Sequence, residues 1–253
     1  MNSLKLLLAT LSLVGLSILS PRTFGAEKIA KTMDEKSLTI QLEEMSAGSK
    51  EKVPPEKRKV MEDAIENLRK THITDHALKV GDKMPPFELP DGNKKMVSSK
   101  TLLKKGPLIV VFYRGGWCPY CNHQLHDLQK YLPQIKGLGA ELVAISPQTP
   151  DNSLSTAQKD KLSFYVLSDV GSKVGKKFGL VYKLPKKLQG LYKEFGIDLE
   201  KSNATRKWEL PLAATYVIKQ DGRISYVFLD VDYKKRAETK DLIDELKSFY
   251  DAK

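Results

Sequence analysis

The two cysteines of the chain, Cys118 and Cys121, are three residues apart and enclose a Pro-Tyr pair. They follow an apolar run, residues 107–113, and open a segment whose leucines recur at helical spacing. In the first turn of a helix, positions i and i+3 lie on the same face, so the two sulfurs can come within bonding distance. A Cys-x-x-Cys pair at such a strand-to-helix junction is typical of a redox dithiol.

Position within the predicted helix suggests a role for each thiol. The unpaired N–H groups and partial positive charge of a helix N-terminus favour a thiolate. We therefore expect Cys118 to attack, with a pKa below the ordinary value of about 8.5. Pro119 suits the first helical turn, where its missing N–H costs nothing, and Arg114 is a nearby cation. Cys121, one turn further along, is the natural resolving thiol.

A structural disulfide and a zinc site are two other interpretations of the pair. A disulfide across so short a loop stabilises a fold little, because the gain grows with loop length. A zinc site would add His123 and His126, but residues 121 and 123 do not share a helix face. Structural zinc sites also draw their second ligand pair from a distant element. We therefore expect both histidines on the helix surface, with His123 as a candidate for proton transfer.

An α/β fold is expected to position the pair. The apolar runs at residues 107–113 and 141–146 fit strands buried on both faces, as in a parallel sheet. Further strands are expected at 95–98, 164–167, 213–219 and 223–229, and further helices at 152–161, 172–178, 187–195 and 236–250. The order β-α-β-α-β followed by β-β-α predicts a mixed sheet with helices on both faces.

The first 26 residues have the pattern of an export signal. Lys5 precedes an apolar run, residues 6–19, which is long enough for a signal peptide and short for a spanning helix. Cleavage is expected near Gly25 or Ala26 and is favoured over an uncleaved anchor. We therefore expect an exported protein, periplasmic or extracellular, with no stable membrane contact after cleavage. Disulfides persist in those compartments.

Residues 27–76 form a charged segment with apolar side chains at helical spacing. We expect a helical extension that packs on a main domain at residues 77–253, in preference to a dimerisation helix. The net charge of +11 comes with 8% aromatic residues and no recognised nucleic-acid motif, so no nucleic-acid partner is expected. The 41% of hydrophobic residues excludes a wholly disordered chain, and 29% of charged residues excludes a polytopic membrane protein. The oligomeric state stays open.

Residues 77–253 resemble the alkyl-hydroperoxide-reductase/thiol-specific-antioxidant proteins, the peroxiredoxin-like branch of the thioredoxin superfamily. The resemblance is carried by VGDKMPPFEL (80–89), FYRGGWCP (112–119) and YVIKQDGRI (216–224). The Pro-Tyr pair between the cysteines is similar to that of glutaredoxins. The resemblance implies a thioredoxin-like fold and an enzyme that needs no cofactor and no metal.

The resemblance also implies a reaction. The cysteine that matches Cys118 attacks a hydroperoxide and becomes a sulfenic acid, which a second thiol converts to a disulfide. Cys121 is that second thiol by position, and a thioredoxin-like dithiol protein then reduces the pair. The Leu210-Pro211 step resembles the cis-proline step of the family. The residues expected to support the active site are Arg114, Trp117, Pro119, Tyr120 and Pro211.

Two positions depart from the pattern of typical peroxiredoxins. Gly115 stands where they have a threonine, and residues 212–218 lack their arginine, so Arg114 or Arg206 must substitute. The first hypothesis is an exported thiol-dependent peroxidase for hydrogen peroxide or organic hydroperoxides. The second is a thiol–disulfide oxidoreductase that acts on protein substrates through the same pair. The third is a redox-inactive binding protein, against which the two intact cysteines argue.

Overall fold

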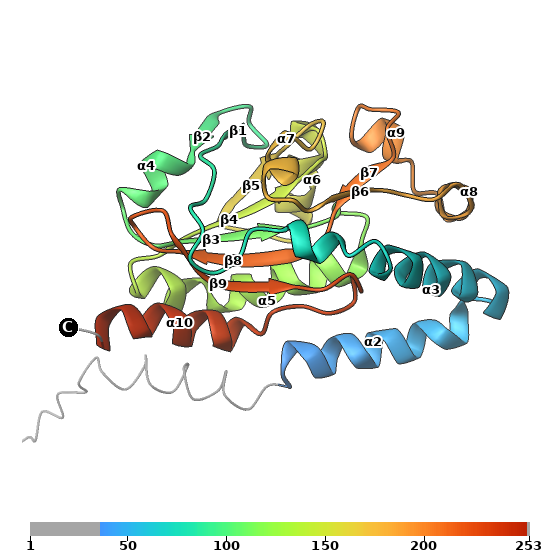
Figure 1. Cartoon of the computed structure of the whole chain (residues 1–253), viewed down its shortest axis with the longest axis horizontal. Helices are drawn as coiled ribbons and strands as arrows, with labels where there is room; N and C mark the ends of the chain where they lie inside the picture. The colour runs from blue at the N-terminus through green and yellow to red at the C-terminus, as the bar shows by residue number, and fades with distance from the viewer. Residues whose placement is uncertain (1–35, 252–253) are drawn as a thin grey trace, which may run out of the picture. The chain divides into compact units, whose positions relative to one another are not determined.

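A five-stranded mixed sheet lies at the centre of the computed structural model, which describes residues 36–251 (Figure 1). The strand order is β5-β4-β3-β8-β9, with β3 (Leu108–Phe112), β4 (Glu141–Ser146), β5 (Tyr165–Ser168), β8 (Ala214–Ile218) and β9 (Ile224–Leu229). The first three strands are parallel, β8 is antiparallel to β3, and β9 is antiparallel to β8. The predicted mixed α/β sheet is confirmed. The predicted signal peptide, residues 1–26, lies outside the described residues.

The central strand β3 forms because it is apolar throughout and can be covered on both faces. All five of its residues are buried. Successive side chains of a strand point to opposite faces, so Ile109 and Val111 enter one core while Val110 enters another. The carboxyl end of β3 therefore sits firmly between two packed layers, directly before the cysteines.

Helices and a hairpin cover the two faces of this sheet. On one face, α5 (Pro119–Gly137) packs against α10 (Thr239–Asp251), and the two lie side by side in Figure 1. The other face is covered by α7 (Lys173–Lys177) and by the antiparallel pair β1 (Glu88–Pro90) and β2 (Met96–Ser98). Two further helices are α4 (Ser99–Leu103) and α6 (Pro150–Lys159). In the part of the chain that the structure describes, no helix is both long and apolar enough to cross a membrane.

The described part of the segment before residue 77, residues 36–76, is helical and packs on the sheet domain. It contains α2 (Leu38–Lys52), α3 (Pro55–Arg69) and the short 3-10 helix η1 (Ile73–His76). Leu38 and Leu42 of α2 enter the same core as α5. The Glu238 carboxylate, just before α10, accepts hydrogen bonds from the N–H groups of Leu38 and Thr39, at 3.0 and 2.7 Å. Such a carboxylate satisfies orphan donors at a helix start.

Three elements near the site have no clear signal in the sequence. They are β6 (Val181–Lys183), β7 (Glu209–Pro211) and α9 (Leu199–Ser202). Strands β6 and β7 form a small antiparallel sheet in which Val181 pairs with Pro211. The cis-proline expectation at Leu210-Pro211 is wrong, because the described residues contain no cis peptide bond. The step is extended instead, since β7 pairs with β6 and the following N–H, of Leu212, bonds to the Leu180 carbonyl.

Candidate active site

The loop between β3 and α5 carries the Cys-Pro-Tyr-Cys motif and is fixed by hydrogen bonds to the rest of the fold. The Gly116 N–H donates to Oε1 of Gln148 at 2.7 Å, and Nδ2 of Asn122 donates to the Gly116 carbonyl at 2.9 Å. Gly115 has a φ of +144°, and a Cβ there would lie 2.4 Å from Nε1 of Trp117. The loop therefore excludes a threonine at position 115, because Trp117 occupies the space that its side chain needs.

The structure brings the two thiols together at the start of α5. Cys118 is the N-cap residue and Cys121 lies in the first turn. Their exposed fractions are 1% and 0%, and both are free thiols. A hydrogen bond links the two side chains, as their spacing on one helix face allows. The pair is thus a buried dithiol whose members can exchange a proton.

Arg114 places a buried positive charge beside Cys118. Its Nη1 lies 3.7 Å from Sγ of Cys118, and its Nη2 donates to the Tyr192 hydroxyl. The guanidinium is 4.0 Å from the ring centroid of Tyr233 and 5.0 Å from that of Trp117. Aromatic faces attract a cation and hold it away from water. Arg114 therefore presents a positioned charge to the sulfur.

A second guanidinium contacts the second sulfur. Nη2 of Arg236, in the loop between β9 and α10, lies 3.3 Å from Sγ of Cys121. Its Nη1 donates to the backbone carbonyls of Tyr233 and Lys235. Sequence reasoning missed this contact because residue 236 was expected to open the closing helix, which begins at Thr239. The site thus pairs each sulfur with one arginine.

The acidities of the two thiols differ from the expectation. Burial, followed by the hydrogen bond and charge of Cys121, raises the pKa of Cys118 well above its ordinary value, against the opposing charge of Arg114. Burial also acts to raise the pKa of Cys121, but the Cys118 hydrogen bond and the charges of Arg236 and Arg114 lower it to about 5. The predicted low pKa of Cys118 is therefore wrong for this arrangement. Its side chain makes no capping hydrogen bond to the helix N-terminus.

Of the other residues that were expected to support the active site, some lie within it and some lie outside it. Trp117 contacts the Tyr192 ring edge to face at 5.6 Å, and Tyr120 contacts Tyr233 in the same way at 5.7 Å. Pro119 is exposed at the first position of α5. Arg206 is exposed in the loop between α9 and β7, so the buried cation beside Cys118 is Arg114.

The two histidines of α5 have partners away from the sulfurs. Nε2 of His123 lies 3.2 Å from Oε1 of Gln41 on α2, and Nε2 of His126 lies 3.2 Å from a carboxylate oxygen of Asp160. Partial burial, then the charges of His126 and Lys130, lower the pKa of His123. Among residues 36–251, no group of three or more His, Cys, Asp or Glu side chains is arranged to hold a metal ion.

An apolar cavity of about 180 Å³ lies against Arg114. One wall comes from α3, and the opposite wall comes from β6 and from α8 (Lys186–Glu194), against which α3 packs. Its lining side chains near the site are Met61, Ala64, Ile65, Leu68, Tyr182, Leu188, Tyr192 and Tyr233. The Arg114 guanidinium therefore lies both at the wall of this cavity and beside the Cys118 sulfur, 3.7 Å from it.

Several known proteins are similar to this chain in sequence or in fold. The AhpC/TSA family model matches residues 80–227. Chloroplastic peroxiredoxin Q of Sedum lineare is 32% identical over 161 residues, which cover 64% of this chain and 74% of that protein. Peroxiredoxin Bcp of Escherichia coli K12 is 29% identical over 153 residues, which cover 60% and 86% of the two chains. The crystal structure of peroxidoxin BcpB from Mycobacterium tuberculosis superposes with a TM-score of 0.54 at 20% identity, over 68% of this chain and 97% of that chain. At that identity the likeness shows the fold alone.

Proposed function

The chain belongs to the AhpC/TSA family of peroxiredoxins, which are thiol-dependent peroxidases, and we propose that Cys118 is its peroxidatic thiol and Cys121 its resolving thiol. One observation carries this proposal: both sulfurs are buried at the start of α5, with one guanidinium on each, at 3.7 and 3.3 Å. Positioned positive charge stabilises the sulfur anions and the oxyanion that form during peroxide reduction.

The first step transfers one oxygen atom to Cys118. Cys121 carries the negative charge of the reduced pair and accepts the Cys118 proton through the hydrogen bond between them. The Cys118 sulfur then attacks the terminal oxygen of the hydroperoxide, an S–O bond forms, and the O–O bond breaks. The departing alkoxide takes the proton back from Cys121. Cys118 is thereby oxidised to a sulfenic acid, and the hydroperoxide is reduced to an alcohol or to water.

The second step closes the disulfide. The Cys121 thiolate attacks the sulfenic sulfur of Cys118, so the S–S bond forms as the S–O bond breaks and hydroxide leaves. An external dithiol protein of the thioredoxin type then reduces the disulfide through a mixed disulfide and is itself oxidised. No cofactor enters either step. Steady-state turnover of hydrogen peroxide with reduced thioredoxin tests the cycle, which predicts one disulfide of thioredoxin formed for each peroxide consumed.

The cavity beside Arg114 favours organic hydroperoxides over hydrogen peroxide. Its apolar lining suits an alkyl or aryl group, while Arg114 faces the polar end. The hydroperoxide oxygen would then lie next to Arg114 and Cys118. Because α3 supplies one wall, the helical extension takes part in substrate selection.

Filling this cavity tests the preference. In the Ala64→Phe variant, we expect kcat/KM for cumene hydroperoxide to fall by about tenfold or more, because the ring occupies the space of the substrate group. The value for hydrogen peroxide is expected to fall by less. Ala47→Phe is a matched control, since Ala47 is exposed on α2. Equal losses for both peroxides would contradict the preference.

A thiol–disulfide oxidoreductase is the second candidate, and the spacing of the two cysteines favours it. The match to the AhpC/TSA family and the similarity to peroxiredoxins oppose it. A higher rate with a disulfide-bonded protein substrate than with any hydroperoxide would favour this candidate. Export, predicted from residues 1–26, remains part of the proposal and is tested by fractionation of the native host.

A further inference from the structure

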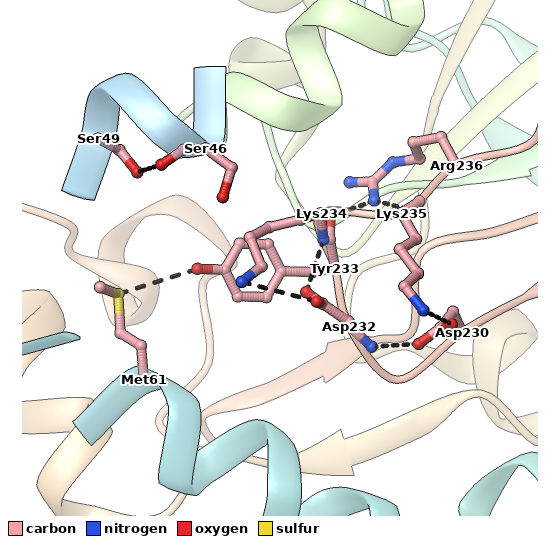
Figure 2. Close-up of polar contacts among 9 residues, drawn as sticks. All are labelled: Ser46, Ser49, Met61, Asp230, Asp232, Tyr233, Lys234, Lys235 and Arg236. Atoms are coloured by element: carbon pink, nitrogen blue, oxygen red, sulfur yellow. Dashed lines mark hydrogen bonds and ion pairs between the residues drawn. The ribbon is translucent and has the colours of Figure 1, made fainter. Parts of the chain in front are cut away.

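The loop between β9 and α10 brings a charged side chain of its own to the dithiol. Its residues 230–236 are held by contacts within the loop, as Figure 2 shows. Lys235 forms an ion pair with Asp230 at 3.2 Å, and Lys234 forms one with Asp232 at 3.6 Å. The Tyr233 hydroxyl reaches Sδ of Met61 on α3 at 3.8 Å. The loop that carries Arg236 is thus held in place by these contacts.

Within residues 36–251, no carboxylate forms an ion pair with Arg236. Of the described arginines, Arg69 and Arg223 form ion pairs with acids. The hydrogen bonds of Arg236 go to Cys121 and to two backbone carbonyls. Its exposed fraction is 4%, and its buried Nε has no hydrogen-bond partner within the described chain. A buried charge without a counter-ion is costly, and the anion within reach of this one is the Cys121 thiolate.

We propose that Arg236 holds and activates Cys121 as the thiolate that resolves the Cys118 sulfenic acid. The inference rests on the proposed function, and it adds a residue outside the matched stretch 80–227. The two arginines then serve different steps: Arg114 faces the sulfur that attacks peroxide, and Arg236 faces the sulfur that attacks the sulfenic acid. Once Cys118 is oxidised, Arg236 still contacts Cys121 and keeps it charged for the second attack.

Several charged or titratable groups near Cys121 affect its protonation. Cys118 lies beside it on α5, Arg236 contacts it from the α10 side, and Arg114 approaches from the loop after β3. Tyr113 and Tyr182 also interact with it electrostatically, but burial raises the pKa of both phenols, so they stay neutral. The two guanidiniums are therefore the groups that favour the thiolate through their charge, and Arg236 makes the direct contact.

The test is the pH profile of disulfide formation after a single addition of hydrogen peroxide, measured in wild type and Arg236→Met. The charges of Arg236 and Arg114 lower the pKa of Cys121, so the wild-type rate should already be flat from about pH 6 upward. In the variant the pKa returns toward about 8.5, so at about pH 6 we expect disulfide formation to be about tenfold slower, even though a more basic sulfur is more nucleophilic. Near pH 8.5 the difference should close.

Two further variants separate this role from a structural one. Arg236→Lys keeps the charge and should restore most of the wild-type profile, while Arg206→Met removes an exposed arginine and should change nothing. A variant profile that has the wild-type shape, or that is lowered equally at every pH, would overturn the proposal. The charge of Arg236 also acts on Cys118, whose pKa it lowers. The rate of peroxide consumption is therefore measured in the same experiment, and it should fall by a smaller factor than the rate of disulfide formation.

A measurement on the Cys118→Ser variant does not depend on turnover or on the folding of Arg236 variants. The ultraviolet absorbance of the single remaining thiolate, that of Cys121, is followed against pH. A midpoint well below about 8.5 shows the charged Cys121 that the proposal requires, and a midpoint at or above that value overturns it. If wild type forms no disulfide with peroxide, the proposed function fails, and this titration still decides whether Arg236 and its surroundings charge Cys121.

Discussion

Replacement of Cys118 by serine should lower peroxide reduction at least about 10³-fold, the scale on which loss of a nucleophile acts. Serine keeps the size of the side chain, but its hydroxyl is not ionised beside Arg114 and cannot carry the oxygen as a sulfenic acid. The sulfur sits at the N-cap of α5 with 1% exposure, so the substitution changes little of the packing. The measurement is the initial rate of hydrogen peroxide consumption by the reduced variant.

The control for this variant is its thermal unfolding temperature, which should lie close to that of wild type. A folded Cys118→Ser protein that still consumed peroxide at the wild-type rate would remove Cys118 from the reaction. The remaining cysteine, Cys121, would then be the attacking thiol, in agreement with its lower pKa. The same experiment therefore decides which of the two thiols attacks.

Replacement of Cys121 by serine should have a different effect and stop the reaction after one turnover. Without Cys121 the Cys118 proton passes to water instead, so the attack on peroxide beside Arg114 is slower but still occurs, and no thiol is present to convert the sulfenic acid to a disulfide. We expect one equivalent of hydrogen peroxide to be consumed and the oxidised cysteine to be trapped by dimedone. Turnover with reduced thioredoxin should fall at least about 10²-fold, because no positioned thiolate is left to attack the sulfenic sulfur of Cys118 and displace its oxygen.

Two observations would contradict this expectation. Sustained turnover of Cys121→Ser with thioredoxin at the wild-type rate would show that Cys121 has no resolving role. Absence of any dimedone adduct, with no peroxide consumed, would show that Cys121 is needed for the attack itself. Loss of the Cys121 charge removes one of the causes that raise the pKa of Cys118, so the first turnover should not be abolished.

The parts of the site that are local in sequence could be predicted. The apolar run before the cysteines predicts β3, and the leucines after them predict α5, because burial follows the period of each element. Cys118, Cys121 and Arg114 lie within eight residues of one another in that junction, so their proximity follows from helix geometry. The charged helical extension was also visible as a pattern.

The parts that depend on packing between distant elements could not be predicted. Tyr192, Tyr233 and Arg236 reach the site from α8 and from the loop before α10, more than 70 residues from the cysteines. No period or spacing in the sequence marks them. The cis-proline expectation failed for the same reason: the pairing of β7 with β6, which keeps Pro211 extended, has no clear sequence signal. Both thiols are buried, so the order of their acidities depends on the hydrogen bond between them and on Arg236.

The most direct test of the account mixes the reduced protein with one equivalent of hydrogen peroxide and follows peroxide and free thiols together by stopped flow. We predict rapid loss of the peroxide, loss of both thiols to one intramolecular disulfide, and neither change in Cys118→Ser. The disulfide is identified as Cys118–Cys121 by mass spectrometry of the digested protein. Peroxide consumption no faster than that of a free thiol, tested also with cumene hydroperoxide, would contradict the assignment of this dithiol as the peroxide-reducing centre.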